Sequence, residues 1–355
     1  MKYIGFFSQA PFISGAERCL QIILHEINQH PKFAPILFVP AKSPMIAWAA
    51  SENIPCVQIE LLANKLTAAQ RLIVQAKIIF WCIRYRIQVI HSNQIWTYKI
   101  IPSLLKLLGI KTVVHLRDPI DSSTTWWFDQ GANAVVSISS FIKKSFSETF
   151  PLYSGLNAQL IDPINKPQRA IHSRAKDSKI VIGFIGQIRD EKGLFELVKA
   201  LEKAKLTYSW QLRIAGCDNS NTQAYIHQVQ SFIDEHKLTS QVEWLGFVND
   251  LDTFYDSIDI VVVPSKQEPL GLIPLEAAIR KRPAIISAVG GLVENVQHNT
   301  TGFIFQDYET DLIDTLRGLN THPLERMGEE AHMALDPNTS PKQHVSALLE
   351  IFEDL

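Results

Sequence analysis

The sequence has few cysteines and no long apolar run, and these absences exclude several classes of protein. Its 355 residues include four cysteines, none in a Cys-x-x-Cys pair, so we expect reduced thiols in a reducing compartment rather than a disulfide scaffold. No stretch reaches about 18 apolar residues, so no membrane-spanning helix is expected. The opening run MKYIGFF is too short for a signal peptide. We therefore expect a cytoplasmic protein, and peripheral contact with the inner face of a membrane stays open.

Acidic and basic residues are unevenly distributed. Residues 1–170 hold 17 Lys and Arg against 9 Asp and Glu, a net charge of +8, whereas the remaining residues carry −10. This asymmetry is typical of a protein in which one half contacts a polyanion or an anionic membrane. It also arises when two touching domains offset each other's charge. Both interpretations stay open, and no nucleic-acid partner is expected.

Short apolar runs alternate with helical patterns along the whole chain. Continuous β-branched or aromatic runs separated by helices are typical of a parallel sheet that is covered on both faces. The predicted strands are Tyr3–Phe7, Pro35–Val39, Cys56–Ile59, Val89–His91, Val113–Leu116, Ala134–Ile138 and Gln159–Ile161, then Ile180–Ile185, Gln211–Ala215, Val242–Leu245, Ile260–Val263, Ala284–Ser287 and Gly302–Phe305.

A polar segment rich in proline and charge, Asp162–Ser178, separates the two series and predicts a linker. We therefore expect an α/β protein of two Rossmann-like, doubly wound domains, residues 1–165 and 166–340. A last helix over 341–355 comes after them, and a return of this helix to the first domain is one option. Ligands of such sheets bind at the carboxyl ends of the strands, so the expected site is the cleft between two facing sheets.

The most informative stretch is PSKQEPLGLIPLE, residues 264–276, which follows the buried strand Ile260–Val263. A loop with the carboxylate Glu268 leads through Gly271 into a helix that carries Glu276. Loop amides and a helix N-terminus favour a diphosphate. A carboxylate one turn into the helix can accept hydrogen bonds from a ribose diol, and Glu268 can reach a sugar hydroxyl. The alternative is that Glu276 only complements the helix dipole.

This pattern, Glu-x7-Glu, resembles that of the retaining glycosyltransferases of family 4, which have the GT-B fold. Four further segments resemble the same family: GFIGQIRDEKG at 183–193, LRIAGC at 212–217, VEWLGFVNDLDTFYDSIDIVVVPS at 242–265 and GGLVENVQHNTTGFIF at 290–305. The resemblance implies transfer of a sugar from a nucleoside-diphosphate sugar to an acceptor hydroxyl of a glycan or a lipid-linked sugar. It implies no further cofactor.

The resemblance also implies site residues. Lys192 matches the diphosphate-binding lysine of the family, where a fixed cation stabilises charge on the leaving group. The family's arginine is replaced by Gln187, and Arg189, two residues later, is a substitute. The alternative for Lys192 is a solvated charge. The implied donor-binding residues are Gly15, Gln187, Arg189, Lys192, Val248, Glu268, Leu270, Gly271, Leu272 and Glu276.

Candidates in the first domain follow its strands. The segment SGAER, residues 14–18, resembles the family's Gly-Gly-x-Glu loop, in which Gly15 allows close approach of the backbone. His115 matches the active-site histidine that contacts the donor sugar, and a core histidine is the alternative. Four further residues are candidates for the acceptor side: Ser92, Asn93, Trp126 and Trp127.

Two patterns have competing interpretations. Asp250-Leu251-Asp252 is a DxD string, which holds a metal in other glycosyltransferase folds. Here it precedes an amphipathic helix, so Asp250 is interpreted as an N-cap and no essential metal is expected. Residues 66–86 predict a basic amphipathic helix. Its apolar face, formed by Leu72, Ile73, Ala76, Ile79, Phe80 and Ile83, covers the first sheet in the favoured interpretation and docks on an anionic membrane in the other.

Two other functions stay open. A sugar-nucleotide 2-epimerase shares the fold, but it needs acid and base carboxylates in the first domain. A non-catalytic subunit that binds a nucleotide sugar is compatible with the missing arginine at Gln187. Release of free nucleoside diphosphate only in the presence of an acceptor separates a transferase from both.

Overall fold

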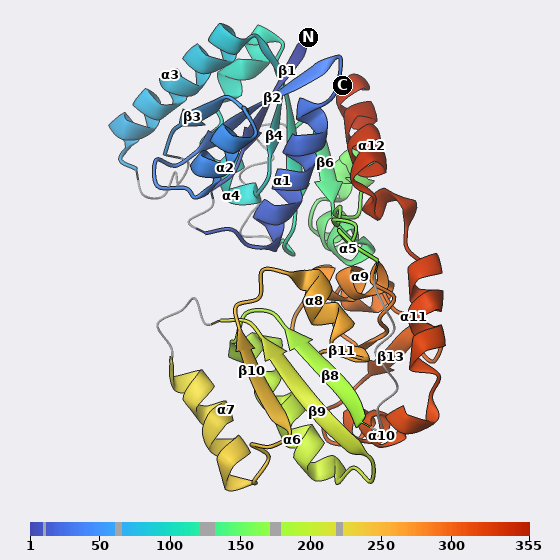
Figure 1. Ribbon diagram of the computed structural model, residues 1–355. Coiled ribbons are helices and arrows are strands. Elements are labelled where there is room, and N and C mark those ends of the chain that lie inside the picture. Colours follow the sequence, from blue (N-terminus) through green and yellow to red (C-terminus); the bar gives the residue numbers. More distant parts are fainter. Residues whose placement is uncertain (10–11, 61–65, 121–131, 171–178, 218–222) are drawn as a thin grey trace. The chain divides into compact units, whose positions relative to one another are not determined.

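A computed structural model describes residues 1–9, 12–60, 66–120, 132–170, 179–217 and 223–355. The chain divides into two compact units (Figure 1). Unit 1 comprises residues 1–165 together with 336–355, and unit 2 comprises residues 166–335. Each unit has its own parallel sheet, so each is described by itself.

Within the described residues, the sheet of unit 1 has seven strands in the order β3-β2-β1-β4-β5-β6-β7. The strands are β1 (Lys2–Phe7), β2 (Phe33–Val39), β3 (Cys56–Gln58), β4 (Ile87–Ser92), β5 (Lys111–Leu116), β6 (Ala134–Ser137) and β7 (Asn157–Gln159). The helices are α1 (Gly15–Asn28), α2 (Met45–Ser51), α3 (Ala68–Tyr85), α4 (Ile95–Tyr98), η2 (Ser103–Leu108), α5 (Ser140–Thr149), η4 (Pro151–Leu156), η8 (Pro337–Thr339) and α12 (Pro341–Glu353).

The sheet of unit 2 has six strands among the described residues, in the order β10-β9-β8-β11-β12-β13. They are β8 (Lys179–Ile185), β9 (Ser209–Ala215), β10 (Val242–Gly246), β11 (Ile260–Val263), β12 (Ala284–Ser287) and β13 (Gly302–Phe305). The helices are η5 (Asp190–Lys192), α6 (Leu194–Ala204), α7 (Gln223–Glu235), α8 (Leu251–Asp256), α9 (Leu272–Ala278), η6 (Leu292–Glu294), α10 (Asp311–Gly318), η7 (Leu319–Thr321) and α11 (Leu324–Met333).

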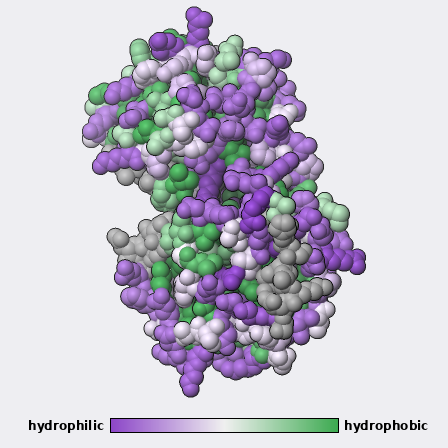
Figure 2. All heavy atoms as spheres, in the orientation of Figure 1, coloured by the Kyte–Doolittle hydropathy of each residue, from purple (hydrophilic) through white to green (hydrophobic). Residues whose placement is uncertain are grey.

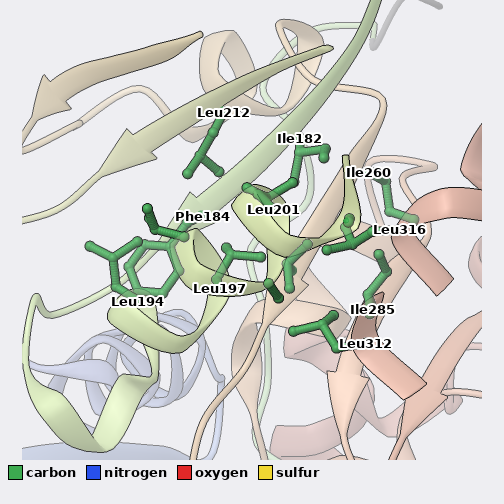
Figure 3. Close-up of a cluster of buried hydrophobic side chains, with 14 of the residues drawn as sticks. Ile182, Phe184, Leu194, Leu197, Leu201, Leu212, Ile260, Ile285, Leu312 and Leu316 are labelled. Atoms are coloured by element: carbon green, nitrogen blue, oxygen red, sulfur yellow. The ribbon is translucent and has the colours of Figure 1, made fainter. Parts of the chain in front are cut away.

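Every strand predicted from the sequence is present, and β7 is displaced by two residues towards the N-terminus. The predicted fold, two Rossmann-like parallel sheets, is confirmed. The apolar runs are continuous because helices cover both faces: all four side chains of β11 are buried. Figure 3 shows one such layer, in which Leu197 and Leu201 of α6 pack against Ile182 of β8 and Ile260 of β11.

In both sheets the strand order reverses beside the first strand of the unit. This switch point lies between β1 and β4 in unit 1 and between β8 and β11 in unit 2. Loops leave the two strands in opposite directions there, which opens a crevice at the carboxyl ends. Functional residues are therefore expected after β8 and β11, and after β1 and β4.

The end of the chain is part of unit 1. Helix α12 lies beside α1 (Figure 1), and Val345, Leu348 and Phe352 join the core of that unit. The imidazole Nδ1 of His344 is 2.8 Å from the carbonyl oxygen of Ile161. The last helix thus returns to the first unit.

Two expectations about unit 1 are wrong. The predicted linker began at Asp162, but Asp162 and Ile164 are buried, because the carboxylate of Asp162 pairs with Arg117 and the amide of Ile164 donates to Thr339. The predicted buried face of α3 is exposed. Val74, Ile78 and Cys82, which lie on the opposite face, are buried instead.

Candidate functional site

The switch point of unit 2 brings together two of the expected donor-binding residues, Lys192 and Glu268. Lys192 ends η5, after β8, and Glu268 lies on the loop after β11. The ammonium Nζ of Lys192 is 2.6 Å from Oε2 of Glu268, and the two side chains are 23% and 15% exposed. The hydroxyl of Ser265 also donates to this carboxylate, at 3.4 Å. A cation and a carboxylate therefore share one partly open site.

Close contacts between backbones hold the loops in place. A Cβ atom on Gly193, where φ is +70°, would lie 1.8 Å from the carbonyl oxygen of Pro264, so the loop after β8 contacts the end of β11 directly. A Cβ on Gly291 would lie 2.2 Å from the carbonyl oxygen of Pro269. These two positions exclude any side chain. The amide of Gly291 donates to the carbonyl of Glu268 at 2.9 Å, which fixes the loop that carries the carboxylate.

Two residues of this region were missed from the sequence. The amide Nδ2 of Asn295 donates to the carbonyl of Leu270 at 2.5 Å and holds the turn before α9. The ammonium of Lys266 lies 2.8 Å from the carboxylates of both Asp190 and Glu196. These carboxylates raise the pKa of Lys266, so it is a second cation beside the loop. Pairing of residues far apart in sequence leaves no pattern that could have indicated them.

Arg189, the expected substitute for the family's arginine, lies at an exposed position of its loop. Arg189 is 45% exposed, and its Nε atom is 3.9 Å from the carboxylate of Glu191. Gln187 is partly buried, and the segment around it runs beside β9, since the amide of Ile188 donates to Cys217. Of the expected phosphate contacts, Lys192 meets Glu268, whereas Arg189 contacts its own loop.

Helix α9 places Glu276 against a buried tyrosine. Glu276 is the fifth residue of the helix, one turn from its start as expected, and Gly271 with φ +85° is the N-cap. Burial raises the pKa of the Tyr255 phenol well above its ordinary value, and the carboxylate of Glu276 contributes through its charge and a hydrogen bond. Leu270 is buried and Leu272 is partly buried. The Tyr255 hydroxyl also donates to the carbonyl of Ile273 at 3.4 Å, so this tyrosine contacts the helix that carries Glu276.

The DxD string has a structural role. Asp250 is the N-cap of α8 and accepts from the amide of Thr253 at 3.1 Å, which confirms the N-cap interpretation. Asp252 is buried and pairs with Arg280 at 2.7 Å. Val248, just before them, packs against the apolar cluster that also contacts Ile273 of α9. Among the described residues, no group of three or more His, Cys, Asp or Glu side chains is arranged to hold a metal ion.

The switch point of unit 1 is organised around Glu17. Ser14 caps α1, Gly15 is the first residue of the helix, and the carboxylate of Glu17 accepts from the amide of Ser14 at 3.2 Å. Gln94, which follows β4, donates to the same carboxylate at 2.8 Å, and Ser8, which follows β1, donates at 3.4 Å. The loop predicted from SGAER is thus tied to both central strands.

His115 lies inside unit 1 rather than at its surface. It is fully buried within β5, and its Nδ1 is 3.2 Å from Nε2 of His91. Its Nε2 lies 3.8 Å from the carboxylate of Asp162. Since its side chain has no exposed surface, a donor sugar cannot touch it in this conformation. The alternative of a core histidine agrees with this burial, although the partner of His115 is the imidazole of His91 rather than the backbone.

Burial and the cation Arg117 lower the pKa of His115 well below its usual value. The same two causes lower the pKa of His91 to about 3, and burial lowers that of His344 to about 3. Six buried polar atoms of this cluster have no hydrogen-bond partner among the described residues: Nδ1 of His91, Nδ2 of Asn93, Nε2 of His115, Nε of Arg117, Oδ1 of Asp162 and Nε2 of His344. Groups of this kind are sites for internal water.

The expected acceptor-side residues do not form a surface. Ser92 ends β4 as predicted, but it is buried and donates to the carbonyl of Gln94 at 2.8 Å. Asn93 is also buried and accepts from Arg117 at 3.2 Å. Both side chains are used by the turn and the buried cluster, so their assignment to the acceptor side is corrected. Trp126 and Trp127 lie outside the described residues.

Comparisons with known proteins agree with this architecture. Residues 166–332 match the family described as glycosyl transferases group 1. An uncharacterized glycosyltransferase of Methanocaldococcus jannaschii is 29% identical over 182 residues, which cover 47% of this chain and 45% of that protein. The lipopolysaccharide core biosynthesis mannosyltransferase LpcC of Rhizobium leguminosarum is 23% identical, over 51% of this chain and 52% of that protein. The chain thus spans about half the length of these relatives.

A solved structure covers the whole chain. The crystal structure of HepE from Anabaena, in complex with UDP, has a TM-score of 0.85, with 17% sequence identity over 100% of both chains. At this identity the likeness shows the fold alone.

Proposed function

We propose that the protein is a retaining glycosyltransferase, because residues 166–332 match the family described as glycosyl transferases group 1 and the chain has the GT-B fold. It transfers a sugar from a nucleoside-diphosphate sugar to a hydroxyl of a glycan or lipid-linked acceptor. One observation carries the proposal. The Lys192–Glu268 pair lies at the switch point between β8 and β11, where sheets of this kind bind nucleotides.

The chemistry of the pair fits this reaction. As the bond between sugar and phosphate breaks, negative charge grows on the leaving diphosphate, and a fixed cation stabilises that charge. Lys192 supplies the cation. When it turns to the diphosphate, the carboxylate of Glu268 loses its partner at 2.6 Å and becomes able to accept a hydrogen bond from the sugar. Glu276 remains at the ribose, held by Tyr255.

The relatives support the acceptor class. LpcC is named as a mannosyltransferase of lipopolysaccharide core synthesis, so a glycan or a lipid-linked sugar is the acceptor proposed here. The complex of HepE with UDP makes UDP the first nucleotide to test. We further propose that the enzyme is cytoplasmic, on its cysteine usage, and needs no metal, since Asp250 and Asp252 have structural partners.

The test is calorimetric binding of UDP, GDP and ADP to the wild-type protein, to Lys192→Met and to a matched control. Lys203→Met is suitable as the control, because Lys203 also pairs with a glutamate, Glu309, on the surface of unit 2. A charge-assisted contact is worth roughly 1.5–3 kcal/mol, so Lys192→Met should weaken the preferred nucleotide about tenfold to a hundredfold. Lys203→Met should leave the affinity unchanged.

Two results would overturn the proposal. One is that no nucleoside diphosphate binds, and the other is that both variants lose affinity equally. For the retaining mechanism, the anomeric configuration of the product is read by NMR with the preferred donor. Retention of the donor's configuration is expected, and inversion would contradict this part of the proposal.

A further inference from the structure

Helix α3 has apolar residues on two opposite faces, and within the part of the chain that the structure describes only one of these faces is covered. Val74, Ile78 and Cys82 pack into unit 1. On the other side of the helix, Leu72, Ile73, Phe80 and Ile83 are all more than half exposed. These four, with Ala76 between them, form the α3 stripe. At 100° per residue they fall within about a third of the helix circumference.

A second exposed apolar segment belongs to the same unit. Leu104, Leu107 and Leu108 of η2 are 57%, 82% and 49% exposed. The guanidinium of Arg71, in the first turn of α3, donates to the carbonyl of Lys99 at 2.8 Å, which ties the start of α3 to the segment that leads into η2. We call the α3 stripe and the three leucines of η2 together the α3–η2 surface.

The distribution of exposed apolar side chains shows that this surface is unusual for the molecule. Among the described residues, fifteen large exposed apolar side chains belong to unit 1 and three, Phe247, Val293 and Met333, belong to unit 2. Seven of the fifteen make up the α3–η2 surface. Figure 2 shows hydrophobic and hydrophilic residues side by side over the part where Figure 1 draws α3. Apolar groups gathered on one face mark an interaction site.

The chain segment that carries this surface has charges of one sign. Residues 61–117 contain nine Lys and Arg and no Asp or Glu. Lys77 and Arg84 flank the α3 stripe, and Lys106 lies among the leucines of η2; all three are exposed. A partner that covers this surface must accept apolar groups and must also be negatively charged.

We propose that the α3–η2 surface docks on an anionic lipid bilayer. Leu72, Phe80 and Leu107 enter the boundary between headgroups and acyl chains, and Lys77, Arg84 and Lys106 contact the lipid headgroups. Charge complementarity favours a bilayer over a second copy of the chain, because two copies of this surface would bring basic residues together. Docking of this kind needs no transmembrane segment, and none of the described helices is long and apolar enough to cross a membrane.

The test is co-sedimentation of the full chain with phosphatidylcholine vesicles and with vesicles that also contain phosphatidylglycerol. Binding should require the anionic lipid and weaken as salt rises, because screening reduces the electrostatic part. Each basic residue near the surface contributes roughly fivefold, so Lys77→Gln/Arg84→Gln/Lys106→Gln should lose roughly a hundredfold in partitioning. Leu72→Ser/Phe80→Ser should lose on the order of tenfold or more.

Matched controls come from the same chain. Lys32→Gln/Lys42→Gln/Lys342→Gln removes the same charge from exposed positions of unit 1 outside this surface, and Met333→Ser removes an exposed apolar side chain of unit 2. Both should bind vesicles like the wild type. Circular dichroism confirms that each variant is folded.

Several outcomes would overturn the proposal. One is vesicle binding that does not depend on lipid charge. Another is an equal loss of vesicle binding in the triple variant of the surface and in the triple control variant. A dimer in sedimentation velocity that Leu72→Ser/Phe80→Ser dissociates would assign the surface to a second copy. The proposal does not rest on the proposed function, because vesicle binding is measured without turnover. A nucleotide that fails to bind would therefore leave it intact.

Discussion

The two switch points of this protein have the same topology, but the polar groups at one are partly exposed and those at the other are buried. In unit 2, the loops after β8 and β11 present the ion pair Lys192–Glu268, which is partly open to solvent. In unit 1, the loops after β1 and β4 meet around the buried carboxylate of Glu17. Behind them, His91, His115 and Arg117 form a cluster with Asp162 that solvent does not reach.

The difference shows how one topology serves two purposes. Polar groups that are partly exposed can exchange one partner for a ligand at low cost, whereas fully buried ones stabilise a fold only while every partner stays in place. The switch point of unit 2 is therefore suited to binding, and that of unit 1 to rigidity. Each of the predictions breaks one side of this comparison and leaves the other intact.

The largest effect is expected from Asp162→Ala. This change leaves the Arg117 guanidinium buried without its carboxylate, which costs about 3–5 kcal/mol of unfolding free energy. Urea unfolding, followed by hydrogen exchange in each unit, measures the loss, which should be confined to unit 1. Glu309→Ala breaks the exposed pair with Lys203 and should have a far smaller effect, because water screens the two charges. Equal losses in the two variants would contradict the comparison.

The second largest effect is expected from acid, which should destabilise unit 1. Burial lowers the pKa of His91 and His344 to about 3 in the folded chain, against an ordinary value of 6.5, so the unfolded chain binds more protons between these limits. Stability is therefore complete above pH 6.5 and is lost as the pH falls towards 3. At pH 5 each histidine should cost about 2 kcal/mol.

Unfolding near pH 7.5 and near pH 5 measures this loss. His344→Gln should reduce the difference between the two pH values by about 2 kcal/mol. His322→Gln, at an exposed position of unit 2, is the control and should leave the difference unchanged. If unit 1 is equally stable at both pH values, protonation of the buried imidazoles does not destabilise it.

The two glutamates of unit 2 should separate binding from turnover. Glu268→Ala removes the partner of Lys192, so free nucleoside diphosphate should bind at least as tightly, while kcat falls about tenfold to a hundredfold. Glu276→Ala removes a contact that does not change as the glycosidic bond breaks, so it should raise Kd and KM with little change in kcat. Calorimetry and steady-state kinetics measure both, and the reverse pattern would exchange the two roles.

The smallest effect is expected from removal of metal ions. Asp250 caps α8 and Asp252 pairs with Arg280, so neither carboxylate of the DxD string is available as a metal ligand without loss of its present partner. Turnover should therefore be unchanged by EDTA. Activity that EDTA abolishes and Mn²⁺ or Mg²⁺ restores would show that a metal binds elsewhere in the chain.

Much of the fold and part of the site could be predicted from the sequence. Periodicity located the strands, and the loop at residues 264–276 pointed to Glu268 because a carboxylate after a buried strand lies at the edge where ligands bind. His115, Ser92 and Asn93 also follow or end strands. The burial of His115 and Asn93 could not be predicted, because the cluster around them includes Asp162 and His344, which come from distant segments.

The covered face of α3 was mistaken for a different reason. Counting apolar residues selects the larger stripe, but the sheet is contacted by the straight row Val74, Ile78 and Cys82 at intervals of four residues. Such a row fits a groove on the sheet with few side chains. Periodicity shows that a face is apolar, and it does not show what covers that face.

The return of α12 to unit 1 has a consequence for synthesis on the ribosome. Residues 166–335 are continuous, so unit 2 is complete as soon as they emerge, whereas unit 1 waits for Val345, Leu348 and Phe352. The part made first therefore finishes last, against the usual order in which an N-terminal domain folds before the domains that are made after it. Until then, the surface of α1 that α12 covers is exposed to chaperones and proteases.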